Sequence, residues 1–187
     1  MKQLIVICGF AGAGKTTIGK ALAKKLDYAF VDKDTISEDF TEYILTKNYS
    51  GKSRDTFMQS AEINRLEYIT SLKVCKDIID NGINVVAALP LALQIESYEK
   101  WKLFAILAGI PSDYDIKFVW IKHDIEKEKL NLFARKSKKD QAKLANWEEY
   151  AASIDGLKID SEYNCIEIEN DDVPDIVAQK IIDKLIS

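Results

Sequence analysis

Histidine and cysteine are scarce in this sequence of 187 residues, which contains one histidine and three cysteines. The cysteines, Cys8, Cys75 and Cys165, are widely spaced, and no CxxC pair occurs. An odd number of scattered cysteines disfavours a disulfide framework, and His123 lacks the closely spaced partners that a zinc site needs. Because each cysteine lies in an apolar stretch, we expect all three to be reduced, buried thiols.

Long hydrophobic runs and an excess of charge of one sign are also missing. No apolar run approaches the roughly 18 residues that span a bilayer, and the short apolar run near the N-terminus is not followed by a cleavage site for an export signal. We therefore expect a cytoplasmic protein without a membrane partner. The net charge of −4 and the pI near 5.2 disfavour binding of nucleic acid by charge alone.

Repeats, low-complexity segments and linkers are absent as well. The length suits one domain, which we expect to cover residues 1–187. Hydrophobic residues make up 47% of the chain and charged residues 30%, which is close to the average of globular proteins and argues against disorder.

Short β-rich runs alternate with segments of helical periodicity along the whole chain. We expect strands at residues 4–8, 28–32, 84–88, 116–121 and 165–168. We expect helices at residues 15–26, 35–81 with a loop at 48–52, 91–108, 126–133, 141–154 and 173–186. This alternation predicts an α/β fold in which helices cover both faces of a parallel sheet.

A glycine-rich motif of the form GxxxxGK[ST] occupies residues 9–16, between the first expected strand and the first expected helix. Its glycines let consecutive backbone N–H groups turn toward phosphate oxygens. Lys15 would reach the β- and γ-phosphates, and the Thr16 hydroxyl would ligate Mg²⁺. The residues expected to bind the nucleotide are Gly9, Ala11, Gly12, Ala13, Gly14, Lys15, Thr16 and Thr17.

Two acids, Asp32 and Asp34, follow the second expected strand. With a period of two, their side chains would leave on one side, at the sheet edge where open α/β sheets bind ligands. One carboxylate could then hold Mg²⁺, and the other could accept a proton from an attacking hydroxyl group. The alternative is that both acids only cap the following helix.

A basic cluster interrupts the later helices and comprises Arg135, Lys136, Lys138 and Lys139. Phosphoryl transfer needs positive charge near the γ-phosphate, and Arg135 is the best candidate because its planar fork fits phosphate. A solvated, charged surface is the alternative interpretation of this cluster.

These residues resemble the small-molecule kinases that carry a phosphate loop, a superfamily that includes shikimate and gluconate kinases, chloramphenicol phosphotransferase and the polynucleotide kinase domain. The resemblance rests on residues 9–17, 31–34, 119–121 and 135–150, and the last of these stretches looks like the lid of kinase-like "AAA family ATPase" proteins. It implies a three-layer P-loop NTPase fold, with a five-stranded parallel sheet in the order 2-3-1-4-5 and a small helical lid. It also implies ATP and Mg²⁺ as cofactors.

Site residues follow from the same resemblance. Asp34 matches the aspartate that activates the substrate, Asp32 is a second acid beside it, and Arg135 matches the lid arginine. Residues 35–82 would form the substrate-binding helices and residues 134–141 the lid. The chain departs from the family pattern in two places, since residues 86–90 contain no acid after the third strand and Asn131 stands where relatives often have an arginine.

The acceptor would contact the segment that follows Asp34. Arg54 and Arg65 could hold an anionic substrate there, although salt bridges to Asp55, Glu62 or Glu67 are an alternative role. The sequence therefore predicts a kinase that transfers the γ-phosphoryl group of ATP to a hydroxyl group of a small molecule. Two alternatives stay open, namely a kinase for nucleosides, nucleotides or 5′-hydroxyl polynucleotides, and an ATP-binding regulatory switch or toxin-like protein.

Overall fold

Five parallel strands form one sheet in the order β2-β3-β1-β4-β5, as expected. The computed structural model describes residues 2–48, 61–92, 94–122, 124–137 and 140–186. The strands are β1 (Gln3–Cys8), β2 (Ala29–Asp32), β3 (Val85–Ala88), β4 (Asp115–Ile121) and β5 (Ile166–Ile168). Because β1 pairs with β3 on one side and β4 on the other, the strand that leads into the phosphate loop lies at the centre of the sheet.

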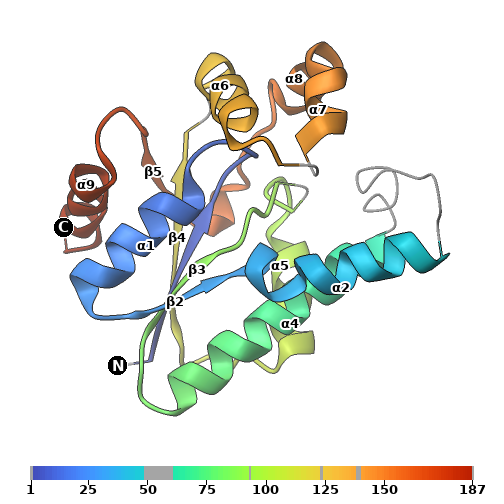
Figure 1. Cartoon of the computed structure of the whole chain (residues 1–187). Coiled ribbons are helices and arrows are strands. Elements are labelled where there is room, and N and C mark those ends of the chain that lie inside the picture. The colour runs from blue at the N-terminus through green and yellow to red at the C-terminus, as the bar shows by residue number, and fades with distance from the viewer. Residues whose placement is uncertain (1, 49–60, 93, 123, 138–139, 187) are drawn as a thin grey trace.

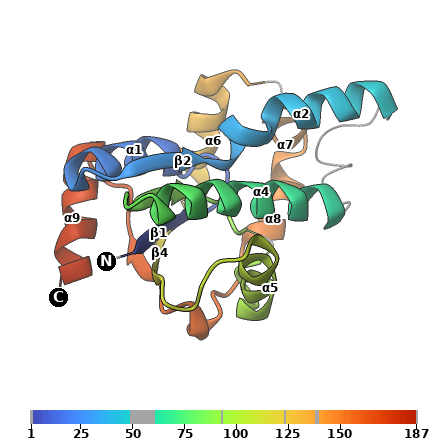
Figure 2. The same ribbon diagram turned by 90° about the horizontal axis from the view of Figure 1, so that it is seen from below.

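Helices cover both faces of the sheet (Figures 1 and 2), which confirms the expected three-layer α/β architecture. Helices α1 (Lys15–Leu26) and α9 (Pro174–Ile186) pack on one face, while α4 (Ala61–Asp80) and α5 (Tyr98–Ala108) pack on the other. Side chains of β1 alternate between these two layers, as strand geometry requires. Leu4, Val6 and Cys8 join the α4–α5 core, whereas Ile5 and Ile7 join the α1–α9 core.

The remaining helices gather around the carboxyl ends of the strands (Figure 1). Helix α2 (Lys33–Asn48) follows β2 directly and packs against α4. Helices α6 (Ile125–Arg135), α7 (Gln141–Ala145) and α8 (Trp147–Ile154) succeed one another after β4, and a 3₁₀ turn (Ser161–Tyr163) precedes β5. This arrangement places helix ends and loops from distant parts of the sequence at one edge of the sheet.

The expectation of a helix over residues 91–108 was wrong at its start, because α5 begins only at Tyr98. Leu91 has a left-handed backbone with φ of 52°, which helical geometry excludes. The Asp160 carboxylate accepts a hydrogen bond from the Tyr98 N–H at 2.8 Å and caps the helix at that residue. Residues 91–97, so far as they are described, form turns instead.

Three further helix boundaries differ from expectation. The helix expected over residues 141–154 is divided into α7 and α8 by Asn146, whose φ of −122° and ψ of 47° are not helical. Helix α2 begins at Lys33 and not at residue 35, and α6 continues to Arg135. Trp147 and Tyr150 pack together in α8 with ring centroids 5.5 Å apart, and Trp147 is buried.

The three cysteines carry no disulfide bond, as expected. Cys8 and Cys75 are buried and Cys165 is half-buried. Burial raises the pKa of Cys75 and of Cys165 to about 12, so these thiols stay protonated. His123 lies outside the described residues. None of the helices that the structure describes combines the length and the apolar character needed to cross a bilayer.

Candidate functional site

The phosphate loop joins β1 to α1 through glycines that adopt left-handed backbone conformations. Gly12 and Gly14 have φ of 88° and 94°. A Cβ atom at Gly12 would lie 2.7 Å from the carbonyl oxygen of Glu128, and one at Gly14 would lie 2.6 Å from Nδ2 of Asn170. Both positions therefore require glycine for its backbone freedom and for its small size.

Two asparagine side chains hold this loop from neighbouring elements. Nδ2 of Asn131, on α6, donates a hydrogen bond to the Gly12 carbonyl at 2.8 Å. Nδ2 of Asn170, just after β5, donates to the Ala13 carbonyl at 3.0 Å. From the sequence, Asn131 was only a departure from the family pattern. Asn170 was not predicted, because a single asparagine far from the loop forms no motif.

Lys15 projects from the first turn of α1 and folds back over the loop. Its Nζ donates a hydrogen bond to the Phe10 carbonyl at 2.6 Å. Burial lowers the pKa of Lys15 to about 8 with a smaller contribution from Arg135, whereas Asp34 and Glu128 act in the opposite direction. Lys15 is therefore protonated at neutral pH but only partly hydrated. This favours binding of an anion, which can replace the Phe10 carbonyl as the acceptor of the Lys15 hydrogen bond.

Thr16 and Asp32 meet at the edge of the sheet. The Thr16 hydroxyl donates a hydrogen bond to Oδ2 of Asp32 at 2.7 Å, and Oδ1 of Asp32 accepts one from the Asp34 N–H at 2.9 Å. Asp32 thus caps α2 and faces the phosphate loop at the same time, so the two interpretations of this acid hold together. In the sheet, Asp32 pairs with Ala88, the last residue of β3.

Asp34 lies in the first turn of α2, so the period of two used to place it beside Asp32 does not apply, although both acids line the same cleft. Nζ of Lys33 lies 3.2 Å from Oδ1 of Asp34 and 2.7 Å from Oε2 of Glu67. The Thr41 hydroxyl donates to the other oxygen of Glu67 at 2.7 Å. Lys33 and Glu67 are buried, so this network restrains the position of the Asp34 carboxylate.

Arg135 ends α6 and does not begin the loop, in contrast to expectation. Its Nε and Nη2 atoms donate to the two carboxylate oxygens of Asp140 at 2.7 and 2.6 Å. Lys136, the next residue, is exposed and has a left-handed backbone with φ of 51°. Lys138 and Lys139 lie outside the described residues.

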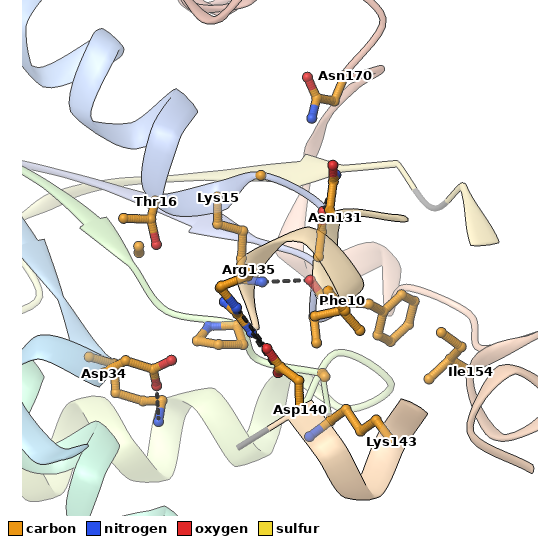
Figure 3. A pocket seen from close by; sticks show the side chains of 18 of the residues that line it. Phe10, Lys15, Thr16, Asp34, Asn131, Arg135, Asp140, Lys143, Ile154 and Asn170 are labelled. Carbon is orange, nitrogen blue, oxygen red and sulfur yellow. Dashed lines mark hydrogen bonds and ion pairs between the residues drawn. The ribbon is translucent and has the colours of Figure 1, made fainter. Parts of the chain in front are cut away.

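These side chains line one cleft of about 1550 Å³ at the carboxyl edge of the sheet (Figure 3). The volume exceeds that of pockets for a single small ligand, which reach about 1000 Å³. The structure thus brings together the residues predicted to be catalytic or to bind the metal ion, namely Lys15, Thr16, Asp32, Asp34 and Arg135. Of the eight loop residues expected to bind the nucleotide, those that line the cleft are Ala11, Gly12, Gly14, Lys15, Thr16 and Thr17.

The two arginines expected on the acceptor side are placed differently. Arg65 is exposed on α4, and its neighbour Asn64 lines the cleft in its stead. Arg54 lies outside the described residues. Tyr68 and Trp101, which could have formed an aromatic wall around a substrate, are buried in the core on the α4–α5 face.

Comparison with known proteins places this geometry in a family. A family model described as "AAA domain" matches residues 4–157. This chain belongs to that family. A shikimate kinase from Chlorobium limicola is 37% identical over 71 residues, which cover 38% of this chain and 35% of that protein. The match therefore spans about a third of the length of that curated relative.

Solved structures with the same fold are also kinases. A sugar kinase from Janibacter sp. HTCC2649 matches with a TM-score of 0.64 and 14% identity, over 98% of this chain and 94% of that one. An APS kinase from Mycobacterium tuberculosis matches with a TM-score of 0.62 and 16% identity, over 99% and 98%. The resemblance to small phosphate-loop kinases and the strand order that it implies are thus confirmed.

Proposed function

We propose that this protein is an ATP-dependent kinase that transfers the γ-phosphoryl group to a hydroxyl group of a small molecule. One observation carries the proposal: the phosphate loop, the acids after β2 and the arginine of α6 line the same cleft. A phosphate-binding loop alone would serve any nucleotide-binding protein, whereas a carboxylate and an arginine facing it suit transfer to an acceptor.

Each charged group has a distinct role in this proposal. Lys15 and Arg135 neutralise negative charge on the phosphoryl group as it moves, which is the main contribution a protein makes to phosphoryl transfer. Asp34 accepts the proton of the attacking hydroxyl group. Lys33 and the buried Glu67 hold Asp34 from behind, so that its carboxylate is kept at the edge of the cleft.

Thr16 and Asp32 fit a magnesium ion by the chemistry of their oxygen atoms, which already lie 2.7 Å apart. In phosphate sites Mg²⁺ is held by one or two carboxylates together with substrate phosphates and water. When bound, the ion would neutralise phosphate charge, and Asp32 would orient it from the position next to Ala88.

The acceptor would lie on the side of the cleft formed by α2, α4, the segment before α5 and the first turn of α5. Polar side chains line this side, among them Glu38, Asn64, Glu96 and Lys100. Such a lining suits a hydrophilic molecule with several hydroxyl groups and not an apolar one. Kinases named for shikimate, a sugar and APS among the similar proteins support the same class.

The experiment is a measurement of ADP release with ATP and Mg²⁺ over a panel of acceptors: hydroxyl metabolites, nucleosides, aminoglycoside and phenicol antibiotics, and a 5′-hydroxyl oligonucleotide. We expect one class to stimulate release, and Asp34→Asn to reduce the stimulated rate at least about 100-fold while ATP still binds. Asp39→Asn is the matched control, because Asp39 is an exposed acid on the same helix.

The absence of an acid at the end of β3 is the feature that favours the regulatory alternative. Strand β3 (Val85–Ala88) contains no acid, and the next two residues are Leu89 and Pro90. A regulatory protein would bind ATP tightly and hydrolyse it slowly, at a rate that no acceptor raises and Asp34→Asn leaves unchanged. That result would reject the kinase proposal.

A further inference from the structure

A buried carboxylate lies beside the arginine of the lid. Asp140 immediately precedes α7, and its side chain is only 2% exposed, whereas the side chain of Arg135 is 45% exposed. Burying a carboxylate is costly unless it is paired and hydrogen-bonded. The arginine supplies that pairing through two parallel hydrogen bonds of 2.7 and 2.6 Å. The acid is thus enclosed, while its partner reaches toward the cleft (Figure 3).

The way in which the two groups meet leaves part of the arginine available. A guanidinium group has five N–H donors in a fixed plane, and the fork to Asp140 uses Nε and one hydrogen of Nη2. Three donors, two of them on Nη1, therefore remain for another acceptor. Because the guanidinium is planar, fixing one edge against Asp140 also fixes the direction of the other edge.

Both partners of this ion pair come from one short segment of the chain, outside the phosphate loop. Arg135 is the last residue of α6 and Asp140 comes five residues later, across a turn in which Lys136 has a left-handed backbone. The Asp140 N–H donates to the Ser137 carbonyl at 3.1 Å, which closes the turn. Lys15 and Lys143 also line the cleft, from α1 and α7, and the printed hydrogen bonds of the Asp140 carboxylate go to Arg135.

We propose that Asp140 is a positioning residue that holds Arg135 in the orientation needed to meet the γ-phosphate of ATP. This inference rests on the proposed function and adds to it a residue that does not touch the nucleotide. A long, half-exposed arginine without a fixed partner would lose side-chain entropy each time it engaged phosphate. The fork to Asp140 meets that cost in the folded protein, before ATP arrives.

A double-mutant cycle tests the inference with Asp140→Asn, Arg135→Ala and the two combined. Asparagine keeps the shape of Asp140 but cannot accept both hydrogen bonds. We expect Asp140→Asn to lower kcat about 10- to 100-fold. It should weaken ATP binding more than ADP binding, because ADP lacks the γ-phosphate. In the Arg135→Ala background the same substitution should change kcat less than about twofold.

Controls separate positioning from a merely structural role. Asp155→Asn removes an exposed acid after α8 and should leave kcat and both affinities unchanged. Thermal melting shows whether each variant folds. If Asp140→Asn does not fold, Asp140→Glu takes its place in the cycle. A structural role predicts lower melting temperatures with equal losses of ATP and ADP binding.

The outcomes distinguish this inference from the proposed function. Equal losses of kcat from Asp140→Asn in both backgrounds, or a gain of kcat from a released arginine, would overturn the role of Asp140 while the kinase stands. If no acceptor is found, the ratio of ATP to ADP affinity is measured in the same cycle, and additivity in that ratio overturns the inference. A wild-type chain that does not bind ATP would reject both.

Discussion

At the scale of single residues, Glu128 stands out as a carboxyl group enclosed beneath the phosphate loop. It is 1% exposed, and its backbone lies against Gly12. Burial raises the pKa of Glu128 to about 8 with a smaller contribution from Asp124, while Lys15 acts in the opposite direction. The acid form is therefore favoured in the folded protein at neutral pH, whereas the unfolded chain ionises near pH 4.5.

This difference predicts how stability depends on pH. Between pH 4.5 and 8 the folded state binds more protons than the unfolded state, so the free energy of unfolding falls as pH rises through this window. In the wild type, the free energy of unfolding should fall by about 3 kcal/mol between pH 5 and 8. Glu128→Gln has no carboxyl group to ionise and should not show this fall. Urea denaturation at both pH values measures it.

The control for this prediction is Glu126→Gln, an exposed acid on the same helix, which should keep the wild-type slope. Identical slopes in the wild type and Glu128→Gln would show that the carboxyl group is ionised in the folded protein.

Residues that belong to a short sequence motif, or that directly follow a recognisable strand, could be predicted from the sequence. Lys15 and Thr16 belong to a motif that carries its own geometry, and Asp32 follows a recognisable strand. Asn131, Asn170 and Asp140 could not be predicted, because each acts on a partner that only the fold brings near. A hydrogen bond between Asn170 and the loop joins positions 157 residues apart.

At the scale of elements, α2 and α4 are joined by a buried ion pair. Lys33 on α2 and Glu67 on α4 lie 2.7 Å apart, and their side chains are 7% and 3% exposed. Thr41 and Ser71 add hydroxyl hydrogen bonds, the first to the carboxylate and the second to the Glu67 carbonyl. The pair therefore sets how the two helices on the proposed acceptor side lie against each other.

Removing one partner should cost more than removing both charges. Lys33→Met leaves the Glu67 carboxylate buried without its cation, which we expect to lower the free energy of unfolding by about 3–5 kcal/mol. Lys33→Met with Glu67→Gln should recover most of this loss, because the amide can still accept from Thr41. Chemical denaturation measures both, and Lys73→Met, at an exposed position of α4, is the control.

If the double variant is no more stable than Lys33→Met, the loss of stability comes from losing the ion pair itself and not from leaving one charge buried without its partner.

Element types were predictable and several boundaries were not. Strands and helices alternate because their apolar periods differ, and this pattern is local. The described residues between 91 and 97 have an apolar pattern yet are not helical. A left-handed Leu91 and a cap from Asp160, 62 residues beyond Tyr98, decide where α5 begins. The tertiary contact overrides the local preference there.

At the scale of the whole molecule, nucleotide binding should stabilise the fold, because the phosphate loop connects the central strand to α1. At a ligand concentration 100 times Kd, binding adds about 2.7 kcal/mol. For a domain of this size that corresponds to a rise in melting temperature of about 5–10 °C. We expect this shift with ATP and Mg²⁺ in a thermal melt.

Lys15→Met should abolish most of the shift, and Lys24→Met, at an exposed position on the same helix, should retain it. A full shift in Lys15→Met would mean that the nucleotide binds elsewhere.

The strand order also has a consequence for how such a protein can diverge. The chain between β2 and β3 is one uninterrupted stretch, and it leaves and re-enters the sheet at two neighbouring strands on one side of β1. The phosphate loop and Arg135 belong to other stretches. Under the proposed function, a lineage can therefore change most of its acceptor side by altering this one block, about a quarter of the sequence, while the phosphate loop is inherited intact.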